Sequence, residues 1–63
     1  MADPNVLAEL DKRIRAVREN IRTLTEQAAA LSGAEDEERA ATRIAEQESL
    51  LAKLIKEREK AAK

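Results

Sequence analysis

The first half of the chain carries an apolar residue at every third or fourth position. From Leu7 to Leu31 the spacings are 3, 4, 3, 4, 3, 4 and 3 residues, the heptad pattern of a helix with one apolar stripe. These seam positions are Leu7, Leu10, Ile14, Val17, Ile21, Leu24, Ala28 and Leu31. Asp3 before Pro4 adds a start signal, because Asp is a favoured N-cap and Pro is tolerated at the first helical position. The pattern predicts a helix over about residues 4–32.

The second half carries a seam of its own, with spacings of 4, 3, 4, 3, 4 and 3 residues. Its positions are Ala40, Ile44, Gln47, Leu51, Leu54, Arg58 and Ala61, and Leu50 and Ile55 flank them. This seam predicts a second helix over about residues 35–61. Nine residues separate Leu31 from Ala40, and at about 100° per residue the stripe turns by about half a turn over that distance. A single straight helix would therefore carry its two apolar stripes on opposite sides.

The segment between the seams, LSGAEDEE, contains turn signals. Gly33, the chain's single glycine, can adopt the left-handed conformation that closes a helix. Ser32 and Glu35 have the spacing of a capping box, and the acidic residues 35–38 suit the positive end of a following helix. Both interpretations place a break at about residues 32–35, although they compete for its boundary. We expect one all-α domain over residues 1–63, an antiparallel helical hairpin, rather than one long continuous or swapped helix.

In a hairpin that turns near Gly33, facing residues have numbers that sum to about 66. Small alanines then face each other near the turn, and larger aliphatic residues face each other farther along. At the open end Leu7 faces Arg58. We expect the methylene stem of Arg58 to pack on Leu7 and its guanidinium group to reach Glu9.

Composition indicates that this hairpin self-associates. Alanine supplies 13 of the apolar residues, so few larger side chains remain for a core, and two helices cannot enclose one. The apolar face of the second helix, from Leu50 round to Ile55, is wider than a two-stranded seam and suits a bundle. We expect a homodimer that forms a four-helix bundle, with the relative direction of the two hairpins left open. Gln47 then sets register or oligomeric state, or lies at the rim.

Residues that the chain lacks exclude several classes of function. Without cysteine, histidine or aromatic residues it has no disulfide, no thiolate or imidazole metal ligand and no ring for base stacking. No enzymatic activity, cofactor, metal site, small-molecule ligand or membrane partner is expected. The stretch MADPNVLAEL has neither the basic nor the long apolar region of a signal peptide, so cytoplasmic localisation is expected.

Charged residues are abundant, yet the formal net charge is only −1. Arg15, Arg18 and Arg22 share an outer face of the first helix and form the one candidate stripe for nucleic acid. Asp11 and Glu19 each lie four residues from Arg15, where they suit local ion pairs. A solvated charged face is therefore the favoured interpretation of this stripe.

The expected layout resembles the Rop-type regulators, plasmid RNA-binding proteins in which short helical hairpins dimerise into a four-helix bundle. The resemblance is one of form, because no motif is shared and the aromatic residue on the RNA-binding face of that family has no counterpart here. It implies a nucleic-acid-binding regulator as an alternative function. The favoured expectation is a structural or protein-interaction module, a scaffold or adaptor that pairs with itself or a protein partner. A designed or excised coiled-coil segment is the third hypothesis.

Overall fold

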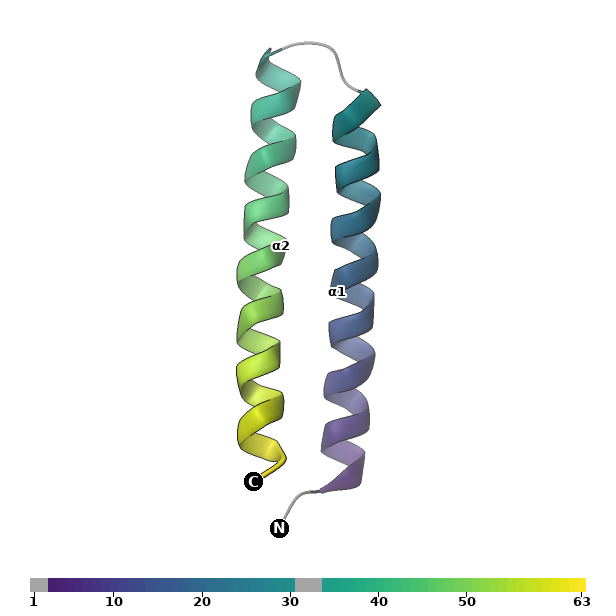
Figure 1. Ribbon diagram of the computed structural model, residues 1–63, viewed down its shortest axis with the longest axis vertical. Helices are drawn as coiled ribbons and strands as arrows, with labels where there is room; N and C mark the ends of the chain where they lie inside the picture. Colours follow the sequence, from purple (N-terminus) through teal and green to yellow (C-terminus); the bar gives the residue numbers. More distant parts are fainter. Residues whose placement is uncertain (1–2, 31–33) are drawn as a thin grey trace.

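The computed structural model describes residues 3–30 and 34–63, and these form two antiparallel α-helices (Figure 1). Helix α1 spans Pro4–Ala30 and helix α2 spans Ala34–Ala61. The two helices pack along their length in a slender body of 50 × 14 × 9 Å, and both chain termini lie at the same end. The prediction of an all-α hairpin is confirmed.

Helix α1 begins at a proper N-cap. The Asp3 side chain accepts a hydrogen bond from the backbone N–H of Asn5 at 2.8 Å, and its carbonyl accepts the first helical bond from Leu7 at 3.1 Å. Pro4 occupies the first helical position, where its missing N–H costs nothing. The expected start signal therefore operates as the sequence indicates.

Helix α2 ends with bonds that close its last turn. The N–H of Ala62 donates to the Arg58 carbonyl at 2.9 Å, and that of Lys63 donates to the Lys60 carbonyl at 3.3 Å. Arg58 and Lys60 lie in this turn, where positive charge complements the helix dipole.

The observed helix bounds can be set beside the expected ones. The first helix was expected over about residues 4–32 and spans Pro4–Ala30, and the second was expected over 35–61 and spans Ala34–Ala61. The predicted turn residues Ser32 and Gly33, and the seam residue Leu31, lie outside the described residues.

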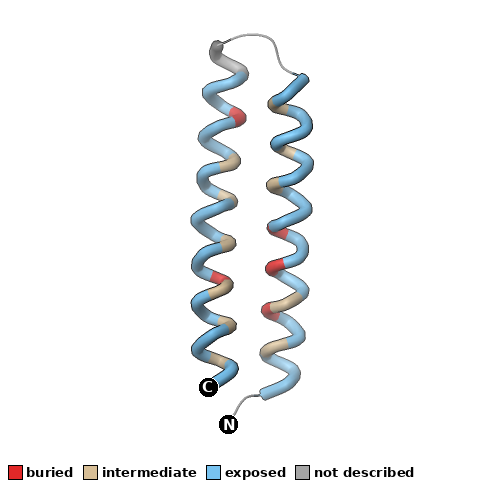
Figure 2. Tube along the Cα trace, in the orientation of Figure 1, coloured by how far each residue is buried: buried red, intermediate tan, exposed pale blue. Residues whose placement is uncertain are grey.

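The core is a single cluster near the open end of the hairpin (Figure 2). It consists of Leu10, Ile14, Val17 and Leu54, with Ile21, Leu51, Ile55 and Ala61 packed against it. Toward the turn the one buried side chain among the described residues is Ala40. Every seam residue that the structure describes is buried or half-buried, whereas the other residues of 3–30 and 37–63 are exposed apart from Asp11 and Ile55.

The two flanks of the α2 seam are covered unequally. Ile55 is half-buried and packs against the core cluster, whereas Leu50, on the opposite flank, is 40% exposed. Two helices meet along a single line of contact, so they cover one flank of a wide apolar face and leave the other open. Leu50 therefore contributes little to the core of the hairpin.

Neither helix offers, in the part of the chain described, a window of residues both long and apolar enough to span a bilayer.

Candidate interaction surface

Among the residues that the structure describes, one ion pair joins the two helices directly. The guanidinium group of Arg58 donates from Nε to the carboxylate of Asp11, next to the core cluster. Sequence reasoning expected Glu9 as the partner of Arg58, and this prediction is wrong. Asp11 lies on the flank of α1 that faces α2, whereas Glu9 lies on the other flank and pairs within its own helix with Arg13, at 3.8 Å.

This ion pair shifts both titrations. The hydrogen bond from Arg58 lowers the pKa of the Asp11 carboxyl group, the positive charges of Arg58 and Arg15 act in the same direction, and partial desolvation opposes them. The same hydrogen bond raises the pKa of Arg58. Both side chains are more than 40% exposed, so solvent screens part of their attraction.

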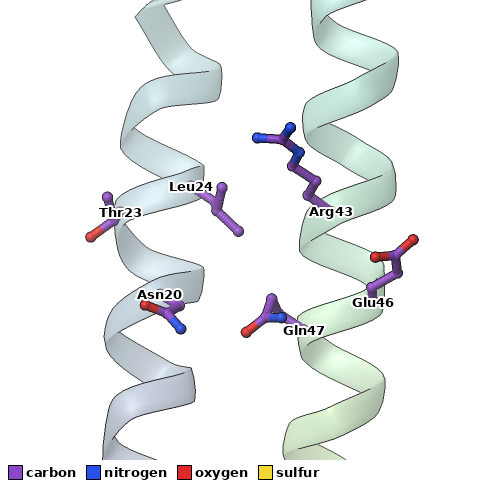
Figure 3. A pocket seen from close by; sticks show the side chains of 6 residues that line it. All are labelled: Asn20, Thr23, Leu24, Arg43, Glu46 and Gln47. Carbon is purple, nitrogen blue, oxygen red and sulfur yellow. The ribbon is translucent and has the colours of Figure 1, made fainter.

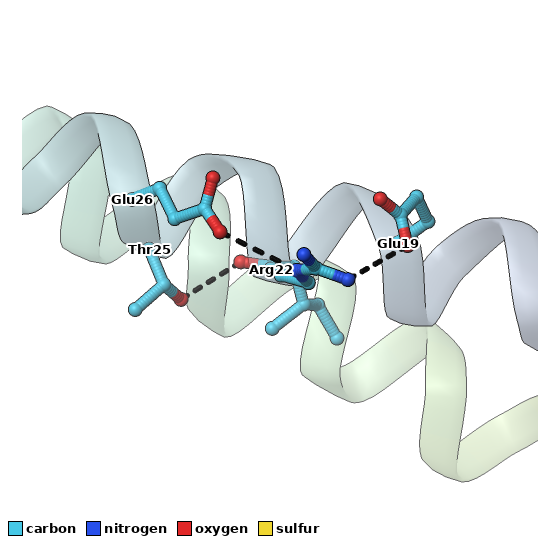
Figure 4. A network of polar contacts seen from close by, with 5 residues as sticks. Glu19, Arg22, Thr25 and Glu26 are labelled. Atoms are coloured by element: carbon cyan, nitrogen blue, oxygen red, sulfur yellow. Dashed lines mark hydrogen bonds and ion pairs between the residues drawn. The ribbon is translucent and has the colours of Figure 1, made fainter.

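A second polar network lies on the outer side of α1 (Figure 4). Arg22 contacts Glu26 at 3.3 Å and Glu19 at 3.9 Å, and the hydroxyl of Thr25 donates to the Ile21 carbonyl at 2.7 Å. The four-residue spacing suggested that Glu19 pairs with Arg15. In the structure Glu19 pairs with Arg22 instead. These side chains are about 70% exposed, so each pair contributes little to stability.

The three arginines of the candidate nucleic-acid stripe therefore differ in their ion pairing. Arg22 is engaged by carboxylates of its own helix, whereas Arg15 and Arg18 are exposed and form no ion pair within residues 3–30 and 34–63. Neither residue belongs to the seam between the helices.

A shallow polar hollow lies between the helices on one broad side of the hairpin (Figure 3). Its volume is about 270 Å³, and it is lined by Asn20, Thr23, Leu24, Arg43, Glu46 and Gln47. Gln47 is half-buried at its seam position, and its amide points across the gap at the level of Asn20. The hollow is open to solvent, and its charged lining residues are Arg43 and Glu46.

The other broad side of the hairpin holds the arginine stripe. The first (a) positions of the heptads are Leu7, Ile14, Ile21 and Ala28 in α1 and Ile44, Leu51 and Arg58 in α2, a series that extends back to Glu37. Residues one or four positions after an a position lie on this side of each helix. The α1 residues there include Arg15, Arg18 and Arg22, and the α2 residues include Glu38, Glu48 and Glu59, all exposed. We call this side of the hairpin, which carries these six charged residues, the charge-divided face. Sequence reasoning missed the three glutamates, although the same heptad count identifies them once the helices are known to be antiparallel.

Among the described residues, no group of three or more Asp, Glu, His or Cys side chains is arranged to hold a metal ion. No protein-family model, curated protein or solved structure matches the chain. Proposals about its function therefore rest on its own geometry.

Proposed function

We propose that this protein is a self-associating helical hairpin that serves as a structural scaffold or adaptor and has no catalytic activity. The observation that carries this proposal is a half-open seam, by which we mean that the apolar residues along the helix contact are incompletely covered. Five side chains among the described residues are buried, and each of them still keeps 6–8% of its surface exposed. The remaining large seam residues, such as Ile44 and Leu51, are only half-buried.

Surface area supports the same proposal. A compact monomer of 7.0 kDa is expected to expose about 4000 Å², whereas the hairpin exposes 5050 Å². The excess of about 1000 Å² is similar to the ~800 Å² that each partner contributes to a stable interface. A second hairpin laid on this slender body would cover the half-buried seam and complete a four-helix bundle.

The arrangement of titratable groups supports a non-catalytic role. General acid–base catalysis requires carboxyl or amino groups in a desolvated pocket. In residues 3–30 and 37–63 no charged side chain is buried, and the hollow between the helices is shallow and open to solvent. A scaffold acts through the surface that it presents, and it needs no such pocket.

Sedimentation equilibrium between about 1 and 500 μM tests the proposal. We expect the weight-average mass to rise from 7.0 kDa toward twice that value, with helicity, measured by circular dichroism, rising in parallel because the bundle stabilises the hairpin. A monomer mass throughout this range would overturn the proposal.

A further inference from the structure

The charge-divided face sorts its charges by helix. On α1 it carries Arg15, Arg18 and Arg22, and on α2 it carries Glu38, Glu48 and Glu59. Among the described residues, one opposite charge interrupts each half of this face: the Arg58 guanidinium group on the α2 side and the Asp11 carboxylate on the α1 side. These two groups are bound to each other. The hairpin thus presents one positive and one negative edge side by side.

Most of these charges have no partner within the hairpin. Arg22 is held by two carboxylates of its own helix, but the other five of the six residues form no ion pair among the residues that the structure describes. Arg18 and Glu48 occupy equivalent flanking positions of the two helices and are both exposed. The charges are therefore available to a partner with the opposite arrangement.

A second copy of the chain has that arrangement. We propose that two hairpins pack through their charge-divided faces with both turns at the same end, so that α1 of each copy lies on α2 of the other. This inference rests on the proposed self-association and specifies its geometry. Each basic edge then meets an acidic edge, and the twofold symmetry forms the contact twice.

Symmetry leaves two ways to pair the same face, and charge selects between them. A twofold axis parallel to the helices keeps the turns together and sets α1 against α2 of the partner. A twofold axis across the helices puts the turns at opposite ends and sets α1 against α1, so that arginines face arginines and glutamates face glutamates. Like charges held together across an interface are unfavourable, which disfavours the second arrangement.

The same-end arrangement also fixes the register. A rotation about an axis parallel to the helices leaves every residue at its own height along the hairpin. Asn20 and Gln47 lie at one height (Figure 3), and Arg18 and Glu48 lie within two residues of them along their helices. Arg18 of one copy therefore lies level with Glu48 of the other.

Small side chains between the charges favour close approach of the two copies. The exposed alanines on this side are Ala8, Ala29, Ala41, Ala45, Ala52 and Ala62. Helices whose contact positions are small can approach to the shorter end of the usual 8–10 Å separation. The opposite side holds the polar hollow and the two exposed large hydrophobic residues, Val6 and Leu50. It mixes both signs of charge on α2, where Arg43 and Lys53 stand beside Glu46.

Charge reversal tests this inference through a mixing experiment. Arg18→Glu and Glu48→Arg each place like charges against the partner, so each variant alone is expected to self-associate at least roughly tenfold more weakly than the wild type. An equimolar mixture of the two variants restores opposite charges at both symmetric contacts. We expect the mixture to form a heterodimer within about threefold of the wild-type dissociation constant. Sedimentation equilibrium measures these constants.

Mixing separates contacts between hairpins from contacts within one. Inside each single variant, residues 18 and 48 carry like charges whether or not a partner is present, so rescue on mixing can arise only between molecules. The matched control is Arg43→Glu on the opposite side, where the same change of charge is expected to alter self-association less than threefold. Circular dichroism at high concentration checks that every variant remains helical.

Each other outcome overturns the inference in a distinct way. A monomeric wild type overturns both the proposed function and this inference, whereas a wild-type dimer with no rescue on mixing overturns this inference alone. Preferred pairing of Arg18→Glu with the wild type would indicate the opposite-end arrangement. A salt-sensitive shift of a double-stranded RNA that is lost in Arg15→Ala and Arg18→Ala, with self-association unchanged, would assign this face to nucleic acid.

A distance measurement checks the geometry without altering the face. A spin label on Asn5→Cys, at the exposed start of α1, reports the separation of the two copies in a dimer. The same-end arrangement predicts a separation within roughly 30 Å, because neighbouring helices lie ~10 Å apart. A separation near the 50 Å length of the hairpin would overturn it.

Discussion

Arg58 occupies a seam position, and its neighbours show how a charged residue is accommodated there. Its side chain is half-buried beside the core cluster, and its guanidinium group reaches out of the seam to the Asp11 carboxylate on the other helix. A long cationic side chain can cover apolar neighbours with its methylene stem while its head remains solvated. The ion pair thus ties the helices together at the end of the hairpin that has no turn.

Acid is expected to weaken the ion pair between Asp11 and Arg58. Because the folded state lowers the pKa of Asp11, its contribution to the free energy of unfolding is complete above the carboxyl pKa of the unfolded chain, about 4, and disappears as the pH falls through the folded value. In Asp11→Asn, urea unfolding at pH 7 and at pH 2 should therefore differ less than in the wild type. Glu9→Gln, which removes an exposed pair within one helix, is the control and should keep the wild-type difference.

Truncation of two leucines should separate core from surface on α2. Leu54→Ala removes a side chain that is buried in the core cluster, and we expect it to lower the free energy of unfolding by about 2–4 kcal/mol. Leu50→Ala, at an exposed position four residues earlier, should lower it by less than about 1 kcal/mol. Urea denaturation at one fixed protein concentration measures both. Equal losses would contradict the observed division of the α2 face.

The sequence predicted which residues lie in the seam better than it predicted which side chains form ion pairs. Seam positions such as Ile14 and Leu51 follow from helix periodicity alone, and the structure places both on the inner side. The partner of Arg58 did not follow, because Glu9 and Asp11 are two residues apart and project to opposite flanks of one helix. The choice between them depends on the rotation of α1 against α2, which no local pattern encodes.

At the scale of the helices, the hairpin is uneven along its length. Aliphatic side chains form the core toward the termini, whereas near the turn the buried residue is Ala40 and the half-buried residue opposite it is Ala28. These small side chains bury little apolar area. Stability is therefore concentrated in the half that lies farther from the turn.

Enlarging the buried Ala40 should disrupt the packing of the two helices near the turn. Ala40→Leu inserts three carbons where α1 and α2 are in contact, and we expect a loss of about 1–3 kcal/mol in the free energy of unfolding. Ala16→Leu makes the same change on an exposed position of α1 and should stay within about 0.5 kcal/mol of the wild type. Thermal unfolding followed by circular dichroism distinguishes the two. If Ala40→Leu left the free energy of unfolding unchanged, the helices near the turn would have space for a larger side chain.

The two helices themselves were accessible from the sequence, since their seams are long and regular and Asp3–Pro4 marks a start. Their packing against each other followed from the half-turn offset between the seams. The unequal covering of Leu50 and Ile55 did not follow, because it is a property of the pair of helices and not of either one.

The whole molecule exposes more surface than a compact monomer of its mass is expected to expose. If association covers this surface, the stability of the fold should depend on protein concentration. If a second copy covers the half-open seam, the midpoint of thermal unfolding should rise by several degrees between 5 and 500 μM, because association stabilises only the folded state. Raising the salt concentration from about 0.05 to 0.5 M should reduce the rise, since exposed charges are screened. Differential scanning calorimetry at several concentrations measures both effects, and a constant midpoint would contradict self-association.

The position of the termini has a practical consequence. Both ends of the chain lie at the end of the hairpin remote from the segment that joins the helices (Figure 1). A short glycine-rich linker between residues 63 and 1, with the chain opened between residues 30 and 34, would reverse the order of the helices and keep their contacts. The seams of α1 and α2 would meet as before, so such a circular permutant should recover the native fold.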